Sequence, residues 1–115
     1  PLPKRPELSS ADLGRASFET RIKFDNNASA DYSLIEVLAM DHPALLETLA
    51  ACLTEKGLDI RFARLQRQGT RVVDAFFVTD REGRKLTDYT QRADIESFIL
   101  HYLDPIILSG KEVRI

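Results

Sequence analysis

The spacing of apolar residues changes at Asp-His-Pro, residues 41–43, and this change limits the folds open to the chain. Before it, apolar and other side chains alternate through YSLIEVLAM, residues 32–40, with the period of a β-strand. After it, leucines recur at helical spacing over residues 45–53, and Gly57 follows where a helix end favours left-handed backbone. We therefore predict a strand that leads directly into a helix over residues 44–56.

The same two patterns predict the other elements. In FETRIKF, residues 18–24, a largely apolar face alternates with charged side chains, which is typical of an edge strand with one solvated side. The polar run at residues 25–31 should turn this strand back into residues 32–40. The remaining predictions are a hairpin of residues 58–68 and 71–80 that turns at Gly69-Thr70, and a helix over residues 89–103 that starts after Asp88 and stops at Asp104-Pro105.

The predicted order is strand, strand, helix, strand, strand, helix, or ββαββα. Two helices over one face of an antiparallel-rich four-stranded sheet make an α+β, ferredoxin-like sandwich. Residues 1–17, with three prolines, have the composition of a flexible linker, so we expect one domain over residues 18–103. Residues 104–115 form a C-terminal extension in which KEVRI is a candidate short strand. The chain starts at Pro1 and not at methionine, which favours a piece of a longer polypeptide.

Composition disfavours several classes of partner. The 16 Lys and Arg are outnumbered by 18 Asp and Glu, for a net charge of -2, whereas a phosphate backbone is bound by excess positive charge. A ferredoxin-like nucleic-acid binder is therefore the least favoured hypothesis. The single cysteine, Cys52, can form neither an internal disulfide nor a zinc cluster, so we predict no metal, no cofactor and a reducing, cytoplasmic setting. No apolar run approaches the roughly 20 residues that span a bilayer, so no membrane contact is expected.

The start of the first helix is the candidate functional site. The first amides of a helix have no intrahelical acceptor, so those of Leu45 and Leu46 suit a carboxylate, and the helix dipole adds positive charge. Local geometry alone would also explain the motif, because proline at the first helical position pre-sets the backbone and keeps His42 out of helical conformation. No serine has an organised base beside it, so no catalytic residue is predicted.

Three segments of the chain, in order, resemble ACT domains, a family of small-molecule regulatory modules. They are YSLIEVLA, then DHPALLETLAACLTEKGLDI, then RVVDAFFVTDREGRKL. The patterns FDN-x-AS-x-x-Y at residues 24–32 and FFVTD-x-x-G-x-K at residues 76–85 are most similar to the C-terminal ACT domains of bifunctional uridylyltransferase/uridylyl-removing enzymes. Those nucleotidyltransferases sense glutamine and modify PII signal proteins in nitrogen regulation. The resemblance covers residues 18–86.

The resemblance implies a non-enzymatic regulatory domain that binds an amino acid, with glutamine as the first candidate. Asp41 and Asp59 occupy the positions that hold the ligand in ACT domains, and two carboxylates suit an α-ammonium group. The full predicted ligand-binding set is Asp41, His42, Pro43, Ala44, Leu45, Leu46, Asp59 and Ile60.

One residue departs from the family pattern and motivates an alternative function. Ala44 stands where ACT domains usually have glycine, and its methyl group would lie close to the path of a ligand carboxylate. The alternative is an ACT-type dimerisation module that has lost ligand binding. Both readings predict a homodimer, or pairing with another ACT domain, because Leu34, Leu38 and Met40 should face away from the helices.

Overall fold

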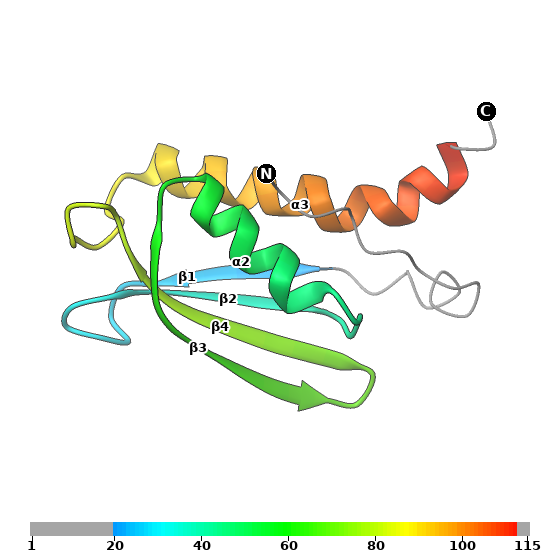
Figure 1. Cartoon of the computed structure of the whole chain (residues 1–115), viewed down its shortest axis with the longest axis horizontal. Coiled ribbons are helices and arrows are strands. Elements are labelled where there is room, and N and C mark those ends of the chain that lie inside the picture. Colours follow the sequence, from blue (N-terminus) through cyan, green and yellow to red (C-terminus); the bar gives the residue numbers. More distant parts are fainter. Residues whose placement is uncertain (1–19, 113–115) are drawn as a thin grey trace.

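The computed structural model describes the backbone of residues 20–112 and the side chains of residues 20–103. Its sheet is fully antiparallel with strand order β1-β2-β4-β3, and both helices lie on one face of it (Figure 1). The predicted order ββαββα and the ferredoxin-like α+β arrangement are confirmed. The elements are β1 (Arg21–Asp25), β2 (Ser33–Met40), α2 (Leu45–Glu55), β3 (Asp59–Gln68), β4 (Arg71–Thr79) and α3 (Tyr89–Glu112).

The N-terminal strand forms an edge of the sheet, as predicted. β1 pairs antiparallel with β2, in a register that runs from Arg21 opposite Leu38 to Asp25 opposite Leu34. Its alternation has the expected result, because Ile22 packs against the core while its neighbours in sequence are exposed. Phe18 and Glu19, the first two residues of the predicted strand, lie outside the described residues, as does the linker predicted over residues 1–17.

The core lies between the helices and the covered face of the sheet. Fully burying a leucine or isoleucine stabilises the folded state by about 1.5–3 kcal/mol. The buried apolar side chains of α2 and α3 therefore stabilise the packing of both helices on the sheet. Cys52 lies in this core, and its burial raises the pKa of the thiol to about 11. The core side chains that are no more than 1% exposed include Ile35, Val37, Leu49, Leu53, Val72, Phe76, Val78, Leu86, Ile95 and Ile99.

A β-bulge in β3 overturns one prediction. The alternation of residues 58–62 predicts that Phe62 shares the covered face with Ile60. The register between β3 and β4 shifts between these two residues, so that Ile60 pairs with Val78 on the covered face but Phe62 pairs with Phe77 on the open face. An inserted residue reverses the face of every later side chain in a strand. Phe62 therefore stacks on Phe77, with ring centroids 4.4 Å apart, and stays 50% exposed.

The second helix is longer than predicted. The Asp104-Pro105 pair does not stop α3, which begins at Tyr89 and continues to Glu112. A proline removes one backbone hydrogen bond and disfavours helical backbone before it, but it does not forbid a helix that continues past it. The start is as predicted, because the Asp88 carboxylate accepts a hydrogen bond from the Thr90 amide at 2.9 Å. Of the proposed KEVRI strand, the first two residues are helical and residues 113–115 lie outside the described chain.

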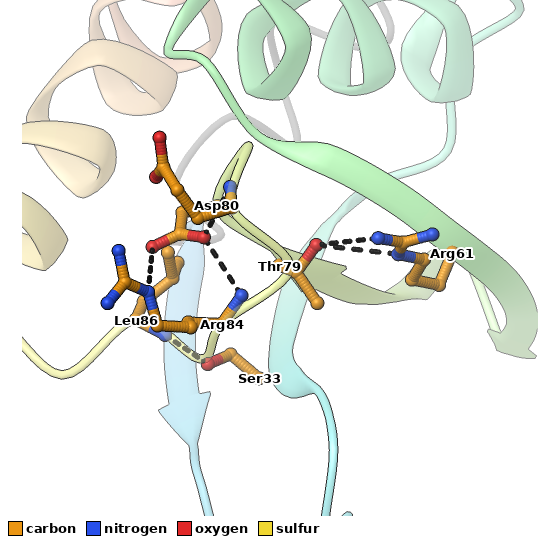
Figure 2. A network of polar contacts seen from close by, with 7 residues as sticks. Ser33, Arg61, Thr79, Asp80, Arg84 and Leu86 are labelled. Carbon is orange, nitrogen blue, oxygen red and sulfur yellow. Dashed lines mark hydrogen bonds and ion pairs between the residues drawn. The ribbon is translucent and has the colours of Figure 1, made fainter.

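A polar network joins the β1–β2 loop and the start of β2 to the segment before α3. The Ser33 hydroxyl accepts a hydrogen bond from the Leu86 amide at 2.8 Å, which Figure 2 shows. The same hydroxyl donates a hydrogen bond to the Asn26 side chain. Asn26 in turn donates to the Leu86 carbonyl at 2.8 Å, and its own carbonyl accepts from Lys85 at 2.7 Å. The FDN and GRKL portions of the sequence therefore meet in space, although about 60 residues separate them.

The adjoining turn after β4 is built around Asp80. Its carboxylate accepts hydrogen bonds from the amides of Glu82 and Arg84, each at 2.9 Å, and Gly83 supplies the left-handed backbone with φ of 82°. Beside it, the Arg61 guanidinium donates to the Thr79 hydroxyl (Figure 2). The polar residues at this end of the sheet therefore have a structural role, because they bond to loop groups and to one another.

Candidate functional site

A cavity of about 310 Å³ lies at the start of α2, between the β2–α2 loop and the second half of β3. Pockets for small ligands run from roughly 300 to 1,000 Å³, so this one suits a small molecule. Five of the eight predicted ligand-binding residues line it together with two residues of β3. The lining residues are Asp41, His42, Pro43, Leu45, Leu46, Leu65 and Arg67.

An ion pair stands at the rim of the cavity. The Arg67 guanidinium contacts the Asp41 carboxylate, and both side chains are partly exposed, at 63% and 39%. The loop and the strand are held next to each other because the Asp41 amide also donates to the Thr70 carbonyl at 3.1 Å. An exposed ion pair contributes little to stability, on the order of 0 to 1 kcal/mol. The two charges are therefore available to a ligand at small cost to the fold.

The helix start offers fewer amides than the sequence predicted. The Leu45 amide already donates to the His42 carbonyl at 3.0 Å, so it is not free. Among the described residues, the amides of Leu46 and Glu47 have no hydrogen-bond acceptor. The cap residue of α2 is Ala44, which has no side-chain oxygen, and its amide lies 3.5 Å from Nδ1 of the His42 ring. Pro43 precedes the cap and is not the first helical residue.

Asp59 and Ile60 lie at the opposite end of the same strand. Asp59 is the first residue of β3 and Arg67 the last but one. At ~3.3 Å per residue, their Cα atoms are roughly 25 Å apart. Asp41 and Asp59 therefore lie far apart within a single copy of the chain, and the cavity brings Asp41 together with Arg67 instead. Ala44 adjoins the cavity in the sequence but is not one of its lining residues.

Asp74 on β4 is a buried acid that the sequence analysis did not select. It is 0% exposed, and neither carboxylate oxygen has a hydrogen-bond partner within the described part of the chain. Burial, together with the smaller effect of the negative charge of Asp41, raises the pKa of this carboxyl to about 6. The available signal was a charged residue inside the apolar run RVVDAFFV, at a position that alternation places inward.

Two classes of site are not found in the structure. Over residues 20–103, no three His, Cys, Asp or Glu side chains come together in an arrangement that could hold a metal ion. In the described residues, no helix is both long enough and apolar enough to cross a membrane.

Comparison with protein families identifies the fold independently. The family model described as "ACR9-like, ACT-like domain" matches residues 21–107. This range begins at the first residue of β1 and ends within α3, so it contains the whole sheet, α2 and the candidate cavity.

Three similar curated proteins carry the same description, "Bifunctional uridylyltransferase/uridylyl-removing enzyme". The protein from Phenylobacterium zucineum (strain HLK1) is 38% identical over 101 residues, which are 85% of this chain and 10% of that protein. Its counterpart in Erythrobacter litoralis (strain HTCC2594) is 37% identical over 99 residues, 86% of this chain and 11% of that protein. The chain thus spans about a tenth of the length of these relatives. No solved structure matches it.

Proposed function

Because the chain belongs to the family of ACT-like domains, we propose that it is an amino-acid-sensing regulatory domain of a PII uridylyltransferase-like enzyme, with glutamine as its ligand. In this proposal the chain is not itself catalytic and works in the cytoplasm, where it reports the nitrogen supply to the nucleotidyltransferase that contains it. The support from the comparisons is the likeness to uridylyltransferase/uridylyl-removing enzymes over 83–86% of the chain.

The observation that carries the proposal is the ion pair between Asp41 and Arg67 at the rim of the cavity. An amino acid is a zwitterion, so its two charged groups need two partners of opposite sign close together. Arg67 can bind the α-carboxylate through its planar fork of donors, and Asp41 can accept from the α-ammonium group. The unpartnered Leu46 amide adds a donor on the carboxylate side.

The remaining lining residues shape the site in this proposal. His42 and Pro43 form the loop wall, while Leu45, Leu46 and Leu65 supply apolar surface for the aliphatic part of a side chain. Leu46 and Leu65 are 42% and 43% exposed, which leaves apolar area for a ligand to cover.

Calorimetric titration of this chain with a panel of amino acids, glutamine included, tests the proposal. We expect binding of glutamine with a dissociation constant in the millimolar range or below, and weaker binding of an analogue that lacks the α-amino group. If no amino acid binds at millimolar concentration, the sensing function is refuted for this chain.

A second candidate function is an ACT-type dimerisation module without a ligand. Ala44 favours it, since the family usually has glycine there, and so does the open face of the sheet. On that face Leu34 is only 6% exposed, because Phe77 and Tyr32 pack around it, and Phe62 is the large apolar side chain left half exposed. We propose that this face pairs with a second copy of the chain or with another ACT domain.

Two measurements test the role of Ala44 and the pairing of the open face. If the Ala44 methyl group crowds the ligand, Ala44→Gly should bind glutamine more tightly than the wild-type chain, although glycine costs the helix start some stability. Sedimentation velocity of the wild-type chain and of Phe62→Glu tests the pairing of the open face. A dimer that Phe62→Glu dissociates supports it, and a wild-type chain that stays monomeric at high concentration refutes it.

A further inference from the structure

We propose that the buried Asp74 carboxylate, together with Asp41, anchors the α-ammonium group of the ligand, so that the cavity deepens toward β4 when an amino acid enters. This inference rests on the proposed sensing function and assigns the second carboxylate of the site.

The Asp74 side chain lies on the same face of the sheet as the cavity. Its neighbours two positions away on β4, Val72 and Phe76, are both in the core under the helices, and side chains two apart in a strand share a face. Across the strands, Asp74 pairs with Leu65 on β3 and with Val37 on β2. Leu65 lines the cavity, so Asp74 is the next residue inward from the cavity wall.

The carboxylate lacks the partners that a permanently buried group normally has. Buried polar groups are hydrogen-bonded in the great majority of cases, and an unsatisfied one calls for a reason. The side chains paired with Asp74 across the sheet, Val37 and Leu65, are apolar and cannot supply a donor. The charged and titratable groups that line the neighbouring cavity are Asp41 and His42 in the loop before α2 and Arg67 on β3.

Asp41 and Asp74 are close enough that the charge of the first raises the pKa of the second. Two neighbouring carboxylates repel each other, and a cation that contacts both relieves this repulsion. Arg67 already contacts Asp41, but Asp74 has no such partner among the described residues. An ammonium group has three donors and no acceptor, so one group can donate to both carboxylates at once.

Access to Asp74 requires one neighbouring side chain to move. On the β2 side it is closed off by Val37, which is 0% exposed. On the β3 side lies Leu65, which is 43% exposed on an edge strand, so its side chain has room to change rotamer. Movement of Leu65 would connect the present cavity with Asp74 and would enlarge it toward the centre of the sheet.

The test compares wild type, Asp74→Asn and the control Asp59→Asn, which makes the same substitution on the distant end of β3. Each chain is titrated by calorimetry with glutamine and with glutaramic acid, the analogue that lacks the α-amino group. We expect Asp74→Asn to weaken glutamine binding by about tenfold or more, as for the loss of one charge-assisted bond. Glutaramic acid should bind wild type and Asp74→Asn equally, and Asp59→Asn should match wild type with both ligands.

The results distinguish failure of the role proposed for Asp74 from failure of the proposed sensing function. If wild type binds no amino acid, the proposed function and this inference both fall. If wild type binds glutamine and Asp74→Asn binds it equally well, only the role of Asp74 is overturned. Equal weakening for both ligands overturns the ammonium contact, because the variant would then have disturbed the cavity as a whole.

A measurement on the wild-type chain covers the case in which Asp74→Asn does not fold. The carboxyl carbon of Asp74 is followed by NMR through a pH titration, with and without saturating glutamine. A bound ammonium group favours the ionised carboxylate, so the titration midpoint should fall when glutamine is present. A midpoint that glutamine leaves unchanged overturns the contact.

Discussion

Replacing Asp74 by asparagine should change how the free energy of unfolding depends on pH. Burial, helped by the charge of Asp41, raises the pKa of the Asp74 carboxyl from 3.8 to about 6 in the folded chain. With a raised folded pKa, the folded state is favoured while the carboxyl is protonated, below about pH 4, and this contribution is lost as the pH rises to about 6. At ~1.4 kcal/mol per pH unit, the loss is on the order of 3 kcal/mol.

Urea unfolding of wild type and Asp74→Asn at pH 4 and pH 7 measures this loss. We expect the stability of the variant, relative to wild type, to be higher at pH 7 than at pH 4 by about 3 kcal/mol, since asparagine cannot ionise. Asp59→Asn makes the same substitution at an exposed carboxyl and serves as the control. If the difference in free energy of unfolding between Asp74→Asn and wild type is the same at both pH values, the ionised Asp74 carboxylate does not destabilise the fold, and the argument is refuted.

Three further substitutions test other parts of the structure. Arg67→Ala should weaken glutamine binding by about tenfold or more in calorimetry, because it removes the partner of the α-carboxylate, whereas Arg64→Ala, on the open face of the same strand, should not. Ser33→Ala should lower the free energy of unfolding by about 1–3 kcal/mol in urea, since the buried Leu86 amide loses its acceptor, and no loss would contradict the network. Gly57→Ala should lower it by about 1–2 kcal/mol, because φ there is 83°, and an unchanged urea midpoint would argue against that backbone.

The sequence was sufficient for the elements whose patterns are local. Alternation in residues 32–40 and leucine spacing in residues 45–53 placed β2 and α2 to within one residue at most ends, because each pattern reflects burial against one neighbouring layer. The two errors in the predicted elements, which are the face of Phe62 and the end of α3, also have local causes. The bulge before Phe62 inserts one residue without any glycine to mark it, and Pro105 is accommodated inside α3 despite its usual role as a stop signal.

The candidate site was predictable only in part, because most of it depends on contacts between distant segments. Asp41, His42 and Pro43 follow one another in the chain, so their position at the helix start was visible in the sequence. Arg67 reaches Asp41 only because the β3–β4 hairpin returns its turn to the end of β2, as the bond from the Asp41 amide to Thr70 shows. Pattern reasoning cannot supply such a register, and it selected Asp59, which lies at the other end of the same strand.

The polar groups of the sheet are satisfied very differently at its two ends. At the end of Ser33 and Thr79, side chains and loop amides bond to one another, so this end is held together without any ligand. At the end of Met40 and Arg71, an exposed ion pair and nearby amides without acceptors surround the cavity, and Asp74 lies buried beyond it with no partner among the described residues. A ligand that supplied an ammonium group and a carboxylate there would satisfy groups that the fold leaves open. Because the hydrogen bonds at the first end stabilise the fold, the second end can contain an unfavourable buried charge. A ligand that binds only the folded chain would offset this unfavourable free energy.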